Sequence, residues 1–72
     1  MNNLNVAKIQ LNGSPYVINN ETNLNQLLNK LRIQKNKVAI EVNGAIVEKN
    51  KYLKVILNKG DKVEIVHFIG GG

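Results

Sequence analysis

One stretch of the sequence has the residue spacing of an amphipathic helix, and it limits the possible folds more than any other feature. Its leucines recur at i, i+3, i+4 and i+7 and form one apolar stripe: Leu24, Leu27, Leu28 and Leu31. Thr22 or Asn23 is placed to cap the first turn. On both sides of this stretch, apolar and polar residues alternate as they do in strands. A single helix among strands must bury its stripe against a sheet, which predicts an α+β fold.

The strand pattern starts before the helix. Residues 6–11 alternate between apolar and polar side chains, residues 12–15 (NGSP) are turn formers, and residues 16–18 are strand-like again. These features predict a hairpin that leads into the helix.

The pattern resumes after the polar loop at residues 34–37. Residues 38–42 alternate and end at Asn43-Gly44, a strong hairpin signal before residues 45–47. We expect residues 48–59 to form an irregular connection packed on the sheet and residues 62–68 to form the last strand. The predicted fold is a mixed sheet of about five strands on one helix.

Composition excludes most kinds of catalytic site. The 72 residues include no cysteine, one histidine and five acidic residues, so thiol chemistry and a metal cage are both poorly supported. Neither a phosphate-binding glycine loop nor an apolar block of membrane-spanning length is present. We therefore expect a cytoplasmic protein that is not an enzyme and binds no metal or membrane.

The charge is lopsided, with ten basic residues against five acidic ones, a formal net charge of +5. Such a balance favours anionic partners, either an acidic protein face or nucleic acid. Arginine and aromatic residues, which contact bases, are nearly absent, so a lysine-rich solvated surface is the simpler interpretation.

The last strand is apolar on both faces toward its end. Glu64, Val66 and Phe68 share one face, and the opposite face carries His67. Two interpretations remain open: Val66 and Phe68 lie in an exposed patch, or the twist of the sheet buries both. His67 has no Ser or Cys near it in sequence, so we expect it to be structural or a surface contact.

The sequence ends in three glycines after this strand. We predict that residues 1–68 form a single domain and that residues 69–72 form a flexible glycine-rich tail, which would reach roughly 13 Å if fully extended. The reactive group of such a tail is the α-carboxylate of Gly72, which is ionised at neutral pH and must be activated before it reacts. The ATP-binding machinery for that activation has to come from a partner.

These segments together resemble a known family. The stretches that match are Val42-Asn43-Gly44, residues 60–68 (GDKVEIVHF) and residues 70–72 (GGG). Over essentially its whole length the chain is similar to the sulfur carrier family of thiamine biosynthesis, whose members have a ubiquitin-like β-grasp fold.

The resemblance implies a function for each part of the tail. An E1-like adenylyltransferase would use ATP to adenylate Gly72, sulfur from a donor would replace AMP to give a thiocarboxylate, and thiazole synthase would accept that sulfur. Gly70 and Gly71 would form the thread. The candidate docking residues are Val66, Phe68 and Ile69. The chain itself would bind no cofactor, since ATP and the sulfur donor are used by the partner enzyme.

Two alternatives remain. The sulfur carrier of molybdopterin synthesis has the same fold and the same Gly-Gly end. Small RNA-linked modules of the β-grasp or S4-like type share the VNG and GD turns, and a net charge of +5 suits phosphate contact. Because such modules need no free glycine carboxylate, we do not expect nucleic acid to be the partner.

Overall fold

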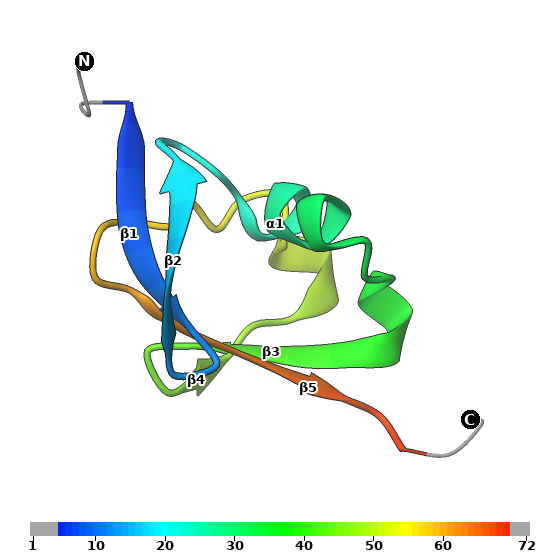
Figure 1. The fold of residues 1–72 in the computed structure, drawn as a ribbon. Helices are drawn as coiled ribbons and strands as arrows, with labels where there is room; N and C mark the ends of the chain where they lie inside the picture. The colour runs from blue at the N-terminus through cyan, green and yellow to red at the C-terminus, as the bar shows by residue number, and fades with distance from the viewer. Residues whose placement is uncertain (1–4, 70–72) are drawn as a thin grey trace.

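The computed structural model describes residues 5–69. Its strands and helices follow the predicted order (Figure 1). The strands are β1 (Val6–Leu11), β2 (Ser14–Asn19), β3 (Val38–Val42), β4 (Ala45–Ile46) and β5 (Lys62–His67). The helices are α1 (Leu24–Leu31) and two 3-10 turns, η1 (Lys35–Lys37) and η2 (Lys49–Lys51).

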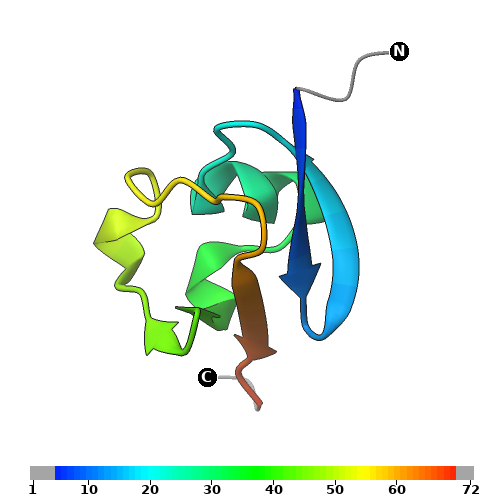
Figure 2. The ribbon, with the colours of Figure 1, turned by 90° about the vertical axis from the view of Figure 1, so that its left-hand side faces the viewer.

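The five strands form one mixed sheet in the order β2-β1-β5-β3-β4. The last strand, β5, lies in the middle, parallel to β1 and antiparallel to β3. The two hairpins lie on either side of it, and α1 packs against one face of the sheet (Figures 1 and 2). The predicted α+β fold, a ubiquitin-like β-grasp with five strands and one helix, is confirmed.

Both hairpins turn on an Asn-Gly pair. Asn12 and Gly13 have φ of 49° and 85°, and Asn43 and Gly44 have φ of 53° and 86°. Two successive positive φ angles are what a two-residue hairpin turn with the twist of a sheet requires. The first turn is shorter than the predicted NGSP segment, because Ser14 and Pro15 already belong to β2. Pro15 is tolerated there because β2 is an edge strand.

The helix is fixed by its cap and its leucines. The Asn23 side chain accepts a hydrogen bond from the Gln26 backbone N–H at 2.8 Å, and the Gln26 side chain accepts one from the Asn23 N–H at 2.9 Å. This reciprocal capping box identifies Asn23 as the N-cap. The leucine stripe faces the sheet, and Leu31 packs, partly buried, against the core that the other three leucines join. This core has twelve buried residues: Ala7, Ile9, Ile18, Leu24, Leu27, Leu28, Val38, Ile40, Tyr52, Leu57, Val63 and Ile65.

The connection between β4 and β5 packs on the sheet as predicted. Tyr52 and Leu57 are buried, whereas Leu53 and Ile56 are exposed. The Leu57 N–H donates to the Thr22 carbonyl at 2.8 Å, which ties the connection to the start of α1. Along residues 5–69, no helix has the length and apolar character needed to cross a bilayer.

Candidate functional site

The far end of β5 carries the exposed apolar residues that the sequence predicted as a docking patch. Val63 and Ile65 are buried, but Val66 is 55% and Phe68 56% exposed. The alternative that sheet twist buries both residues is therefore wrong. Val66 points away from α1 because side chains alternate along a strand, and no part of residues 5–69 forms a second layer on the face opposite α1.

The patch extends across the sheet to a residue that the sequence did not single out. Val66 lies opposite Ala39 on β3, and Ile46 lies opposite Glu41 on the same strand. Because residues 39 and 41 of a strand share one face, Ile46 and Val66 are on the same side of the sheet. Ile46 is 72% exposed. In the sequence, the Asn-Gly turn before Ile46 predicts that this residue belongs to a strand. It does not predict which face of the sheet the Ile46 side chain lies on.

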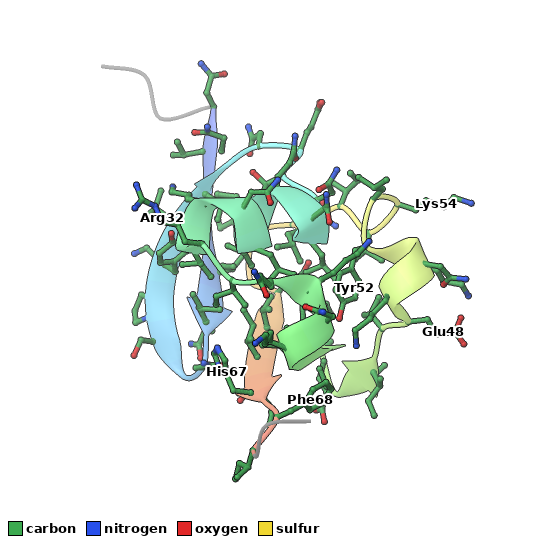
Figure 3. The ribbon with its side chains drawn as sticks, turned by 90° about the vertical axis from the view of Figure 1, so that its right-hand side faces the viewer. Arg32, Glu48, Tyr52, Lys54, His67 and Phe68 are labelled. Carbon is green, nitrogen blue, oxygen red and sulfur yellow. The ribbon has the colours of Figure 1, made fainter. Side chains whose placement is uncertain are left out.

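Phe68 is held in place by two contacts that lie beyond the strand. Its backbone N–H donates to the Lys37 carbonyl at 2.9 Å. The Lys49 ammonium lies 5.3 Å from the centre of its ring and also donates to the Val38 carbonyl at 3.1 Å. Lys49 therefore attaches η2 to the point where the chain leaves the sheet, and no sequence periodicity marks this lysine. Figure 3 shows His67 and Phe68 on opposite sides of the end of β5.

Ile69, the last residue described, is fully exposed. Together, Val66, Phe68 and Ile69 give the end of the domain an apolar surface that leads directly into the tail. Gly70, Gly71 and Gly72 lie outside the described residues, so their roles as thread and modified residue remain predictions. The docking role of the three apolar residues is likewise a prediction, although their exposure is suited to it.

The rest of the described chain offers little acid–base chemistry. No group of three His, Cys, Asp or Glu residues in the range 5–69 is placed to hold a metal ion. A shallow hollow beside the end of α1 is lined by Arg32, Lys35 and by amide and aliphatic side chains. It contains no carboxylate, imidazole or thiol to transfer a proton. His67 is exposed at the sheet end.

One buried group has a perturbed pKa. Tyr52 is almost completely buried, and its hydroxyl has no hydrogen-bond partner among the described residues. Burial raises the pKa of this hydroxyl because the phenolate would lose its hydration. The group lies in the core and does not reach the exposed end of β5, so it bears on stability.

Comparison with known proteins points to one family. The model of the ThiS family matches residues 9–72. The chain is 37% identical over 65 residues to the sulfur carrier protein ThiS of Bacillus subtilis, which covers 89% of this chain and 98% of that one. It is also 46% identical over 65 residues to a thiazole synthase of Magnetococcus marinus, with 90% of this chain matched to 20% of that protein. The chain thus spans about a fifth of the length of this relative.

The fold comparison agrees. The crystal structure of a ThiS thiamine biosynthesis protein from Geobacter metallireducens superposes with a TM-score of 0.79 at 31% identity. The match covers 90% of this chain and 99% of the other. The sequence match extends through the end of β5 to the three glycines, and on this basis the chain belongs to the ThiS family.

Proposed function

We propose that this protein is the sulfur carrier of thiazole formation in thiamine biosynthesis and that Gly72 is the residue that carries the sulfur. An E1-like partner first joins the Gly72 carboxylate to AMP, with release of pyrophosphate from ATP. A sulfur donor then displaces AMP and leaves a thiocarboxylate. Thiazole synthase accepts the sulfur from that group.

The observation that supports this most strongly is the exposed apolar end of β5 in a member of the ThiS family. Val66, Phe68 and Ile69 lie immediately before the glycines and are available to a partner. Full burial of an exposed large apolar side chain gains about 1.5 to 3 kcal/mol, and a partner gains roughly half of that for Val66 and Phe68, which are already nearly half buried. That gain offsets part of the roughly 1 to 2 kcal/mol needed to order each residue of the tail.

Thiazole synthase is supported as a partner by the Magnetococcus relative. That protein carries its region of similarity to this chain within a polypeptide named as a thiazole synthase. The E1-like partner rests on chemistry, because a carboxylate does not react with a sulfur donor until it is activated. ATP and the sulfur donor accordingly bind to the enzymes, and we assign no cofactor to this chain.

Intact-mass measurement tests the proposal directly. Incubation with the adenylating partner, ATP and a sulfur donor should raise the mass by about 16 Da, since one oxygen is replaced by sulfur. Deletion of Gly72 should abolish the shift and leave the circular dichroism and melting temperature unchanged, because the buried core lies between Ala7 and Ile65.

Deletion of Asn2, one residue from the opposite end, is the matched control and should leave the mass shift intact. The mass of the protein from its natural source must also correspond to a chain that ends in the free carboxyl of Gly72. Absence of the shift with an active partner, or a natural chain that continues past Gly72, would overturn the proposal.

A further inference from the structure

The last strand is paired on both sides along only part of its length. β3 accompanies β5 as far as His67, which lies opposite Val38. On the other side, β1 pairs with β5 only at Gln10 and Leu11, and the final pair is Leu11 with Val63. Figure 1 shows β5 running past the β1–β2 hairpin toward the C-terminal end.

Two backbone hydrogen bonds show which backbone groups face the side of β1. The Val63 carbonyl accepts from the Asn12 N–H at 2.9 Å, so residue 63 faces β1. The Phe68 N–H donates to the Lys37 carbonyl at 2.9 Å, so residue 68 faces the side of β3. Because these directions alternate along a strand, the backbone groups of Ile65, His67 and Ile69 face the side of β1.

The first Asn-Gly turn explains why β1 stops. Asn12 has a positive φ and turns the chain away from β5. Its side-chain oxygen nevertheless accepts a hydrogen bond from the Ile65 N–H at 2.7 Å, in place of the next backbone carbonyl of β1. Beyond that bond, the Ile65 carbonyl and the backbone groups of His67 face a side on which the described chain supplies no strand.

The side of residues 65–69 that faces β1, here called the free edge, lacks the features that block strand addition elsewhere in the sheet. Natural edge strands are blocked by proline, by charged residues or by being short. The outer edge strand β2 contains Pro15, and the other outer strand, β4, has two residues. Residues 65–69 (IVHFI) contain no proline, lysine or acidic residue, and their side chains are β-branched or aromatic apart from His67.

We propose that an extended segment of thiazole synthase adds to this edge as a strand, beside residues 65–69. This inference rests on the proposed function. The edge ends at Ile69, and Gly72 follows three residues later in the same chain. An enzyme that holds Gly72 in its active site must have polypeptide beside the tail, and backbone hydrogen bonds to His67 and Ile69 continue that contact back onto the domain. Such bonds also place the tail in one register, because neighbouring strands are fixed by backbone pairing.

The segment that binds here has a defined chemistry. Its backbone is extended, and its side chains on one face lie next to the exposed Val66 and Phe68. We therefore expect an uncharged segment with apolar residues at alternate positions and no proline in the paired stretch.

Amide hydrogen exchange followed by NMR tests the edge directly. In the free protein, the His67 and Ile69 amides should exchange rapidly and the Phe68 amide slowly, because only the Phe68 N–H donates to β3 or its extension. Saturation with thiazole synthase should slow exchange at His67 and Ile69 by at least about tenfold. Phe68 serves as the internal reference within the same segment.

Three results would overturn the inference. The first is a His67 amide that exchanges as fast in the complex as in the free protein. The second is protection that rises with the concentration of this protein alone, since that indicates pairing of two copies. The third is protection by the adenylating enzyme and none by thiazole synthase.

Two substitutions at one position separate the backbone from the side chain. His67→Pro removes the N–H that faces the open edge and removes no hydrogen bond to β3, whereas His67→Ala keeps the N–H. Binding to thiazole synthase should weaken by about tenfold in His67→Pro and remain close to wild type in His67→Ala, because the carbonyl of the added strand loses its donor only in the first. Equal affinities in the two variants, both verified as folded by circular dichroism, would contradict strand addition.

The mass measurement distinguishes failure of this inference from failure of the proposed function. If the mass shift occurs and the His67 amide stays unprotected with thiazole synthase, the protein is a sulfur carrier that does not use this edge. If the mass shift does not occur, the proposed function itself is wrong.

Discussion

The two halves of residues 62–69, which are β5 and the two residues after it, both carry apolar side chains but lie in opposite environments. Val63 and Ile65 are buried between β1 and β3 and beneath α1, whereas Val66, Phe68 and Ile69 are exposed. All five are apolar. The difference arises because side chains alternate along the strand: Val63 and Ile65 face α1, whereas Val66 and Phe68 face the opposite side of the sheet, which has no second layer among the described residues. Apolar side chains in this strand therefore stabilise the domain in one half and remain available to a partner in the other.

The presence of a single α-helix in the described chain explains why only one sheet face is covered. Its eight residues extend about 12 Å at 1.5 Å per residue, so it covers part of one sheet face. The packed half of β5 lies under that cover. The opposite face has no second layer among the described residues, which leaves Val66 and Ile46 exposed together.

The largest expected effect is on the buried half. Ile65→Ala should lower the free energy of unfolding by about 2 to 5 kcal/mol, because it removes buried methyl groups and leaves a cavity. Urea denaturation followed by circular dichroism measures the loss. Val66→Ala, one residue further on the exposed face, is the matched control and should change the stability by about 0.5 kcal/mol or less. Equal losses in both variants would remove the distinction between the two halves.

The exposed half should show the reverse pattern. Phe68→Ala should weaken binding to the adenylating partner by about tenfold, which corresponds to about 1.4 kcal/mol. Its stability should fall by less than about 1 kcal/mol, because more than half of the side chain is exposed and the ring contributes one cation–π contact. Titration calorimetry and thermal melting separate the two effects. A large loss of stability with unchanged affinity would show that Phe68 belongs to the core.

A third prediction concerns a polar atom inside the packed region. Tyr52→Phe should raise the free energy of unfolding by about 1 kcal/mol, because it removes a buried hydroxyl that has no partner in the described chain. The pKa of this hydroxyl is raised in the folded protein, so the folded state holds the phenol proton more tightly than the unfolded state, whose pKa is about 10. The free energy of unfolding of the wild type therefore keeps its full value, as far as this group is concerned, below a pH of about 10, and it falls as the pH rises toward the higher folded-state pKa.

Tyr52→Phe should therefore lose less stability than the wild type between pH 9 and pH 11, as measured by urea denaturation at each pH. Parallel stability curves for the two proteins would show that the hydroxyl is hydrated or hydrogen-bonded in the folded state.

The smallest effect should come from the contact between η2 and the end of β5. Lys49→Met removes the ammonium near Phe68 and its hydrogen bond to the Val38 carbonyl. We expect a loss of about 0.5 to 1 kcal/mol in stability by chemical denaturation. Lys51→Met is the control, because the ammonium of Lys51 forms only an exposed pair with Glu48 at 3.9 Å and should contribute almost nothing. A larger loss in Lys51→Met would contradict the assigned role of Lys49.

Much of the architecture could be predicted from local patterns. The leucine stripe, a cap at Thr22 or Asn23 and the Asn43-Gly44 turn each specify a conformation within a few residues, and all three are confirmed, with Asn23 as the cap. The first turn was predicted too long because Ser14 and Pro15 are turn formers by composition, and only their place on an edge strand makes Pro15 acceptable. Ile46 and Lys49 were missed at the candidate site because their importance depends on neighbours from other strands.

The sequence alone therefore determined the types of element, their order and the glycine tail that suggests a carrier, because each follows from spacing or chemistry along a short stretch. It left open whether Val66 and Phe68 are core or surface. Only the tertiary structure decided that question, because exposure depends on whether another segment covers the sheet face opposite α1, and none does among the described residues. This is set by contacts between segments that are far apart in the chain, and alternation within one strand contains no information about them.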